Sequence, residues 1–84
     1  MRSLKVKVLY FGPAQEAAGS AEEFVLLGNP AFVQDLISEI SKNHEELDRM
    51  NVILKVAVNK EVVDTNAELH HGDEIAFLPP VAGG

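Results

Sequence analysis

The chain ends in Gly83-Gly84, whose terminal carboxylate is the most distinctive chemical group in the sequence. An apolar run over residues 75–81 leads to it and contains Pro79-Pro80. Two prolines cannot continue a sheet ladder and favour an extended exit, and glycine, lacking a Cβ, passes through slots too narrow for other residues. A frayed end without chemical meaning is the alternative interpretation. We predict a flexible tail that delivers the carboxylate into a partner's active site and consists of Pro79, Pro80, Val81, Ala82, Gly83 and Gly84.

The side chains offer little catalytic chemistry. The absence of cysteine excludes disulfides, thiolate-bound metals and thiol catalysis. His70 and His71 are adjacent, so their side chains point apart and no metal site is expected. His44 and the pair Glu22-Glu23 are expected to be solvated. The serines have no evident base partner and no glycine-rich phosphate loop is present, so neither a nucleophilic triad nor nucleotide binding is expected.

The composition is typical of a soluble globular protein. With 84 residues, 46% apolar and 24% charged, the chain is expected to form one domain over 1–84. The formal net charge of -6 argues against binding nucleic acid or anionic membranes and fits a basic partner or active site. No stretch has the length of a bilayer span, and the first residues lack a signal-peptide apolar block, so a cytoplasmic location is expected.

Hydrophobic periodicity predicts five strands and one main helix that must position the tail. The helix is predicted over 30–43, because Asn29 suits the N-cap, Pro30 suits the first helical position, and apolar residues from Val33 to Ile40 form one stripe. The strands are predicted at 4–11, 22–27, 52–59, 61–63 and 74–78, with short helical turns at 14–18 and around 67–69.

The order β-β-α-β-β-β indicates an α+β fold of the β-grasp, or ubiquitin-like, type. In this arrangement one amphipathic helix packs on one face of a mixed sheet, so that both apolar faces are buried. The first and last strands are expected to lie side by side, in parallel, at the centre of the sheet.

Some apolar residues are expected on the sheet face that the helix does not cover. Alternation within the strands directs Leu9, Phe11, Ala76 and Leu78 to this face, and Val62 is a plausible neighbour. A cluster of exposed apolar side chains marks a partner surface. The alternative is that loops cover one or two of them, and a one-residue slip in register would turn them inward.

Three segments of the chain resemble the family of molybdopterin synthase small subunits, the sulfur carriers of molybdenum cofactor synthesis. They are residues 6–12 followed by Gly19, residues 58–61, and residues 71–84, where a Gly-Asp-Glu turn, an apolar strand, Pro-Pro and Gly-Gly occur together. The resemblance covers the whole chain. Ala82 stands where many members have serine or threonine, a mild departure.

The resemblance implies a covalent carrier that is not an enzyme on its own and binds no cofactor. An ATP-using, ubiquitin-activating-type adenylyltransferase would adenylate Gly84, and a sulfurtransferase persulfide would convert it to a thiocarboxylate. The tail would then enter the large subunit of the synthase and donate sulfur to cyclic pyranopterin monophosphate. The resemblance also implies a heterotetramer and places Phe11, Val62 and Leu78 on the partner interface.

Three alternatives remain open from the sequence. The chain could carry sulfur for another pathway, such as thiamine thiazole synthesis. It could be a ubiquitin-type protein modifier that joins Gly84 to a target lysine. It could also be a β-grasp binding module whose tail is incidental, in which case deletion of Gly84 would leave its function intact.

Overall fold

The computed structural model describes residues 3–46 and 55–78. Within them, the predicted strands at both ends of the chain and the short helical turn near residue 14 are confirmed. The elements are β1 (Ser3–Tyr10), α1 (Pro13–Ala18), β2 (Glu22–Gly28), β3 (Ala31–Phe32), α2 (Val33–Asn43), β4 (Lys55–Val58), β5 (Glu61–Val63), β6 (Glu68–Leu69) and β7 (Glu74–Leu78).

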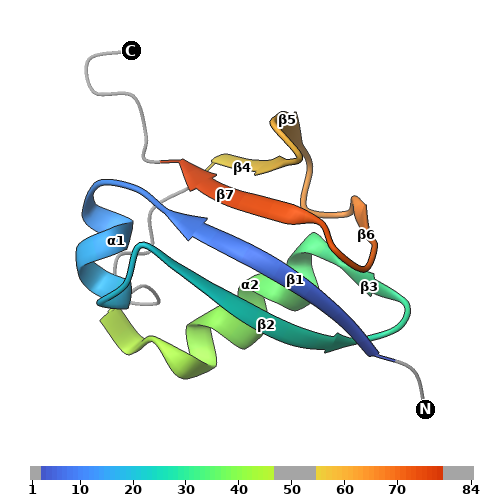
Figure 1. Ribbon diagram of the computed structural model, residues 1–84, viewed down its shortest axis with the longest axis horizontal. Helices are drawn as coiled ribbons and strands as arrows, with labels where there is room; N and C mark the ends of the chain where they lie inside the picture. The colour runs from blue at the N-terminus through green and yellow to red at the C-terminus, as the bar shows by residue number, and fades with distance from the viewer. Residues whose placement is uncertain (1–2, 47–54, 79–84) are drawn as a thin grey trace.

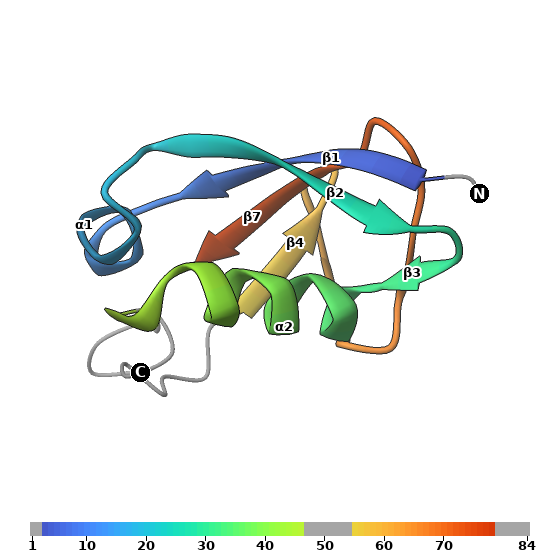
Figure 2. The same cartoon turned by 90° about the horizontal axis from the view of Figure 1, so that it is seen from below.

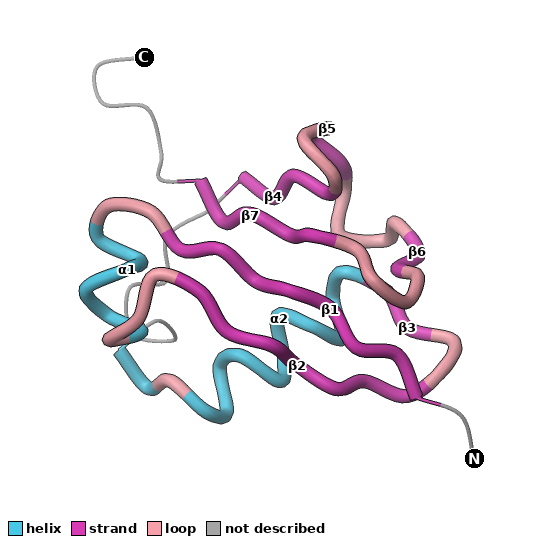
Figure 3. Tube along the Cα trace, viewed as in Figure 1, coloured by secondary structure: helices cyan, strands magenta, loops and turns pink. Residues whose placement is uncertain are grey.

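Five strands form a mixed sheet in the order β2-β1-β7-β4-β5 (Figures 1 and 3). β1 pairs with β7 in parallel and with β2 antiparallel, whereas β4 is antiparallel to both β7 and β5. The parallel central pair is therefore confirmed. β3 and β6 form a separate two-stranded ribbon. In the part of the chain that the structure describes, no helix is long and apolar enough to cross a membrane.

The core lies between the sheet and α2, which runs along one face of it (Figure 2). Val6 and Val8 on β1, Leu36 on α2 and Ile75 on β7 are all fully buried. Their burial follows from period-2 spacing in the strands and period-3.6 spacing in the helix. The expected layer arrangement, with one main helix on one sheet face, is confirmed.

The prediction that the main helix starts at Pro30 is wrong, because α2 begins at Val33. Ala31 instead pairs with Leu69, and Phe32 with Glu68, which makes β3. Phe32 is the N-cap residue of α2, and its backbone N–H donates a 2.8 Å hydrogen bond to Asp35 Oδ2. A carboxylate in the first turn satisfies a donor that the helix leaves unpaired. Strand pairing thus replaces the first turn predicted for the helix.

The short helical turn predicted around residues 67–69 is also wrong. Glu68 and Leu69 form β6, the partner of β3, and Leu69 is fully buried. The strand predicted over 52–59 is described only from Lys55 onward, so its first three residues lie outside the described residues. The fourth predicted strand, 61–63, is confirmed as β5.

Candidate docking face and tail base

The sheet face opposite α2 carries a row of small and aliphatic residues across four strands. Leu9 pairs with Ala76, Ala76 with Ala57, and Ala57 with Val62. Paired residues point to the same side of a sheet, so these side chains form one continuous strip. Val62 is 61% exposed at its end. The prediction from alternation that Leu9 and Ala76 point to this face is confirmed, and Val62, expected as a neighbour, lies on the same face.

Phe11 and Leu78 lie beside this strip. They directly follow Tyr10 and Phe77, which are paired across β1 and β7. Phe11 is 43% exposed, whereas Leu78 is half-buried. The structure therefore places the predicted interface residues Val62 and Leu78 on the outer face, with Phe11 exposed just beyond the end of β1, and their role in binding a partner stays a prediction.

Leu78 is also the last described residue before the tail. The tail residues singled out in the sequence, Pro79, Pro80, Val81, Ala82, Gly83 and Gly84, lie outside the described residues. What the structure describes is the base from which they extend: β7, held between β1 and β4 at the centre of the sheet. A central strand is fixed by hydrogen bonds on both sides, so the tail starts from a rigid position.

Two exposed residues on β2 were missed by the sequence analysis. Phe24 is 62% exposed and Leu26 is 67% exposed, and both point to the outer face because their partners on β1 are Lys7 and Lys5. Alternation had been used for the first and last strands. Its use over residues 22–27 could have predicted that Phe24 and Leu26 are exposed.

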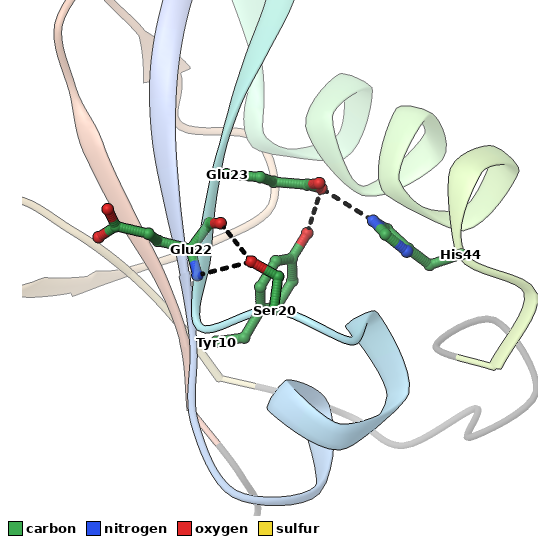
Figure 4. A network of polar contacts seen from close by, with 5 residues as sticks. All are labelled: Tyr10, Ser20, Glu22, Glu23 and His44. Carbon is green, nitrogen blue, oxygen red and sulfur yellow. Dashed lines mark hydrogen bonds and ion pairs between the residues drawn. The ribbon is translucent and has the colours of Figure 1, made fainter.

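A polar network joins β1, β2 and the end of α2 behind the docking face (Figure 4). The Tyr10 hydroxyl donates a 2.6 Å hydrogen bond to Glu23 Oε1, and His44 Nε2 lies 2.9 Å from the same oxygen. Burial, and then the bonded Glu23 carboxylate, raise the pKa of the Tyr10 hydroxyl well above its ordinary value. The expectation that Glu23 and His44 are solvated is wrong, because both side chains are partly buried and contact each other, and Glu23 also accepts the hydrogen bond of the buried Tyr10.

The expectation that Glu22 is solvated agrees better with the structure. Its carboxylate is about half exposed, but it pairs with Lys7 Nζ at 3.3 Å on the outer face. Such surface pairs contribute little to stability.

The turn before β7 is held by side chains. Asn59 donates to Asp73 Oδ1 at 2.9 Å and accepts from the Glu74 backbone N–H at 3.0 Å, which ties the β4–β5 turn to β7. His71 Nδ1 accepts from the Lys5 backbone N–H at 3.1 Å, whereas His70 is exposed next to Asp73. In residues 3–46 and 55–78, no three histidine or acidic side chains are grouped so as to hold a metal.

The topology, the single main helix and the central parallel pair define a β-grasp, ubiquitin-like protein. A solved structure from Pyrococcus furiosus, described as a putative molybdopterin converting factor, subunit 1, matches with a TM-score of 0.85 and 37% identity over 93% of this chain and 99% of that chain. The ThiS family profile matches residues 8–84. The chain therefore belongs to the ThiS family.

Relatives of this chain carry more specific names. It is 37% identical to the molybdopterin synthase sulfur carrier subunit of Chlamydomonas reinhardtii, over 96% of this chain and 100% of that protein. A complex of subunits 1 and 2 of the molybdopterin-converting factor from Helicobacter pylori contains a chain that matches with a TM-score of 0.69 and 29% identity over 96% of this chain and 100% of that chain. SAMP1 of Haloferax volcanii matches with a TM-score of 0.86 and 26% identity over 95% of this chain and 99% of that chain.

Proposed function

We propose that this chain is the sulfur carrier subunit of a molybdopterin synthase. The observation that carries the proposal is the 37% identity, over 96% of this chain and 100% of the relative, to a protein of that name. The chemistry of the sequence supports it, because the terminal carboxylate of Gly84 is the one distinctive reactive group that the sequence analysis identified. The chain itself would supply sulfur and not catalysis.

Activation of the carboxylate comes first. The Gly84 carboxylate attacks ATP on an adenylyltransferase of the ubiquitin-activating type, releases pyrophosphate and becomes an acyl-adenylate. The terminal sulfur of a persulfide on a sulfurtransferase then displaces AMP, and a second thiol reduces the acyl disulfide to a thiocarboxylate. No cysteine of the carrier can intercept the sulfur on the way, since the chain has none.

Docking comes second. The outer face with Phe11, Val62 and Leu78 binds the large subunit, and the tail from Pro79 to Gly84 reaches its active site. The subunit complex from Helicobacter pylori supports a partner of this kind. The thiocarboxylate sulfur is transferred to cyclic pyranopterin monophosphate, and water returns Gly84 to a carboxylate. Two carriers and two large subunits would form the complete synthase.

The direct test is the intact mass of the chain after incubation with an adenylyltransferase, ATP and a persulfide donor. Replacement of one oxygen by sulfur, mapped to Gly84 by fragmentation, is the expected result. An unchanged mass in the presence of an adenylyltransferase that activates a control carrier would count against the proposal. Product formation with the large subunit then separates molybdopterin synthesis from sulfur transfer to another pathway, such as thiamine synthesis.

A second candidate function is protein modification. The 26% identity to SAMP1, a protein whose other solved structure is described as small archaeal modifier protein 1, favours it. In this case Gly84 forms an isopeptide bond with a lysine of a target. Lysine-linked conjugates that disappear when Gly84 is deleted would support this function over sulfur transfer.

A further inference from the structure

Two large apolar side chains on β2 lie outside the strip and its neighbours described above. Phe24 and Leu26 are both more than half exposed on the outer face of an edge strand. Lys5 lies opposite Leu26, and its Nζ is 4.8 Å from the centroid of the Phe24 ring. Scattered apolar exposure is ordinary, but two neighbouring large side chains on one face, one of them beneath an ammonium group, form a cluster. We call Phe24, Leu26 and Lys5 the β2 patch.

The charges around the β2 patch differ from those of the whole chain. The chain has a net charge of -6, and most acidic residues of the described part lie away from the outer face. The strand residues directed to this face include the lysines Lys5, Lys7 and Lys55 but only two acids, Glu22 and Glu74. Three lysines against two acids leave one net positive charge on these strand residues, in contrast to the net charge of -6 of the chain, and complementarity calls for a carboxylate opposite the lysine that has no acidic partner.

Lys7 and Lys5 differ in how their charges are balanced. Lys7 Nζ pairs with Glu22 Oε2 at 3.3 Å. Within residues 3–46 and 55–78, no carboxylate lies within ion-pair distance of Lys5, whose ammonium group rests on the Phe24 ring instead. Lys5 is thus available to a carboxylate from outside, whereas the Lys7–Glu22 pair forms a polar band between the β2 patch and Leu9.

The short distance between the strip and the β2 patch argues that one partner covers both regions. A stable interface uses about 800 Å² on each partner, which corresponds to a patch about 30 Å across. Phe24 pairs with Lys7, two residues before Leu9 on β1, so the β2 patch begins only about 7 Å from the strip. A partner of standard interface size seated on the strip from Leu9 to Val62 therefore reaches the β2 patch.

We infer that the β2 patch is a second contact for the protein that docks at the tail base. The partner lays an apolar side chain on Phe24 and Leu26 and places a carboxylate against Lys5. This inference rests on the proposed function, which identifies the partner as the large subunit of molybdopterin synthase. This contact lies away from the tail base. It therefore fixes the orientation of the whole sheet face on the partner.

The test is the dissociation constant of the full chain with the cognate large subunit, measured by titration calorimetry. Phe24→Ser and Lys5→Glu are each expected to weaken binding at least about tenfold, as hot-spot residues do. Lys42→Glu is the matched control, because it makes the same charge change at an exposed position of α2. It is expected to leave the dissociation constant within about twofold of the wild type. Phe24, Lys5 and Lys42 all lie on the surface, so the temperature of thermal unfolding should change little in these variants. Leu26→Ser replaces Phe24→Ser if the latter fails to fold.

The outcomes separate this inference from the proposed function. Wild-type affinity in Phe24→Ser and Lys5→Glu, together with weakened binding in Phe11→Ser, would overturn the inference and leave the proposed docking intact. Wild-type affinity in Phe24→Ser, Lys5→Glu and Phe11→Ser would overturn both the inference and the proposed docking. A chain that sediments alone as a dimer and becomes monomeric with Phe24→Ser would assign the β2 patch to a second copy, which also overturns the inference.

Discussion

The Tyr10 hydroxyl donates a 2.6 Å hydrogen bond to Glu23 Oε1 and so joins the end of β1 to the start of β2. The Tyr10 ring is also stacked on Phe77, with centroids 6.1 Å apart and planes at 12°. Phe11 follows Tyr10, and Leu78 follows Phe77. These contacts therefore fix the ends of the two central strands, from which two of the proposed docking residues and the tail extend.

Replacement of Tyr10 by Phe should lower the free energy of unfolding by about 1 to 2 kcal/mol, since the variant keeps the ring but loses a hydrogen bond to a carboxylate. Urea denaturation measures the difference. Ser38→Ala, an exposed change on α2, serves as the control and should be nearly neutral. An unchanged urea midpoint in Tyr10→Phe would show that the bond contributes nothing net.

The protonated Tyr10 hydroxyl should contribute its full stability only at a pH below the pKa of the unfolded chain. The folded pKa is raised, chiefly by burial, so the folded state holds the proton more tightly than the unfolded chain, whose pKa is about 10. The associated stability is complete below about pH 10 and falls as the pH rises further. Tyr10 is the sole tyrosine, so its ultraviolet absorbance can be followed alone. Titration of the folded chain near pH 10 would contradict this prediction.

Replacement of a buried leucine and of an exposed leucine should change stability by very different amounts. Leu36 on α2 is fully buried, so Leu36→Ala should destabilise the fold by about 2 to 5 kcal/mol. Leu26 on β2 is 67% exposed, so Leu26→Ala should change stability by less than about 0.5 kcal/mol. Thermal denaturation compares the two variants directly. Equal destabilisation by both would mean that Leu26 is covered in solution.

Asp35 should contribute to stability through the start of α2. Its carboxylate accepts the Phe32 backbone N–H at 2.8 Å and lies in the first helical turn. Asp35→Ala should cost about 1 kcal/mol, because it removes both the hydrogen bond and the favourable dipole interaction. Gln34→Ala, at the neighbouring exposed position, is the control. Chemical denaturation that gives the same midpoint for both variants would argue against this role.

Gly84 and Gly28 form a matched pair of glycine substitutions. Gly84→Ala should fold normally but lose sulfur transfer, since the tail is proposed to pass through a narrow slot. Gly28→Ala should retain both, because nothing lies within 4 Å of the position that its Cβ would occupy. Thiocarboxylate formation by intact mass, followed by product formation with the large subunit, measures the loss. Full activity of Gly84→Ala would refute the tail mechanism.

The strands and their faces could be predicted from the sequence because alternation is a local property. The spacing of Leu4, Val6, Val8 and Tyr10 is enough to direct these side chains inward, and the register confirms it. The same local logic directed Leu9 and Leu78 outward. It also applied to Phe24 and Leu26, so their exposure was within reach of the sequence.

The polar contacts could not be predicted in this way. His44 meets Glu23 from 21 residues away, and Asn59 meets Asp73 from 14 residues away. Short polar motifs around these residues favour solvated surface positions when they are considered alone. Only the packing of α2 against β2 brings His44 within 2.9 Å of a carboxylate.

The sequence by itself determined the fold class and the two faces of the sheet, since each follows from residue types and short-range spacing, and it predicted the glycine-ended tail as the reactive group. The tertiary structure decided where α2 begins, because the pairing of Ala31 with Leu69 overrides the helix-start signal at Asn29-Pro30. It also decided that Phe24 lies beneath Lys5 and that Tyr10 is tied to Glu23. Such contacts depend on strand pairing between distant segments, which local propensity does not encode.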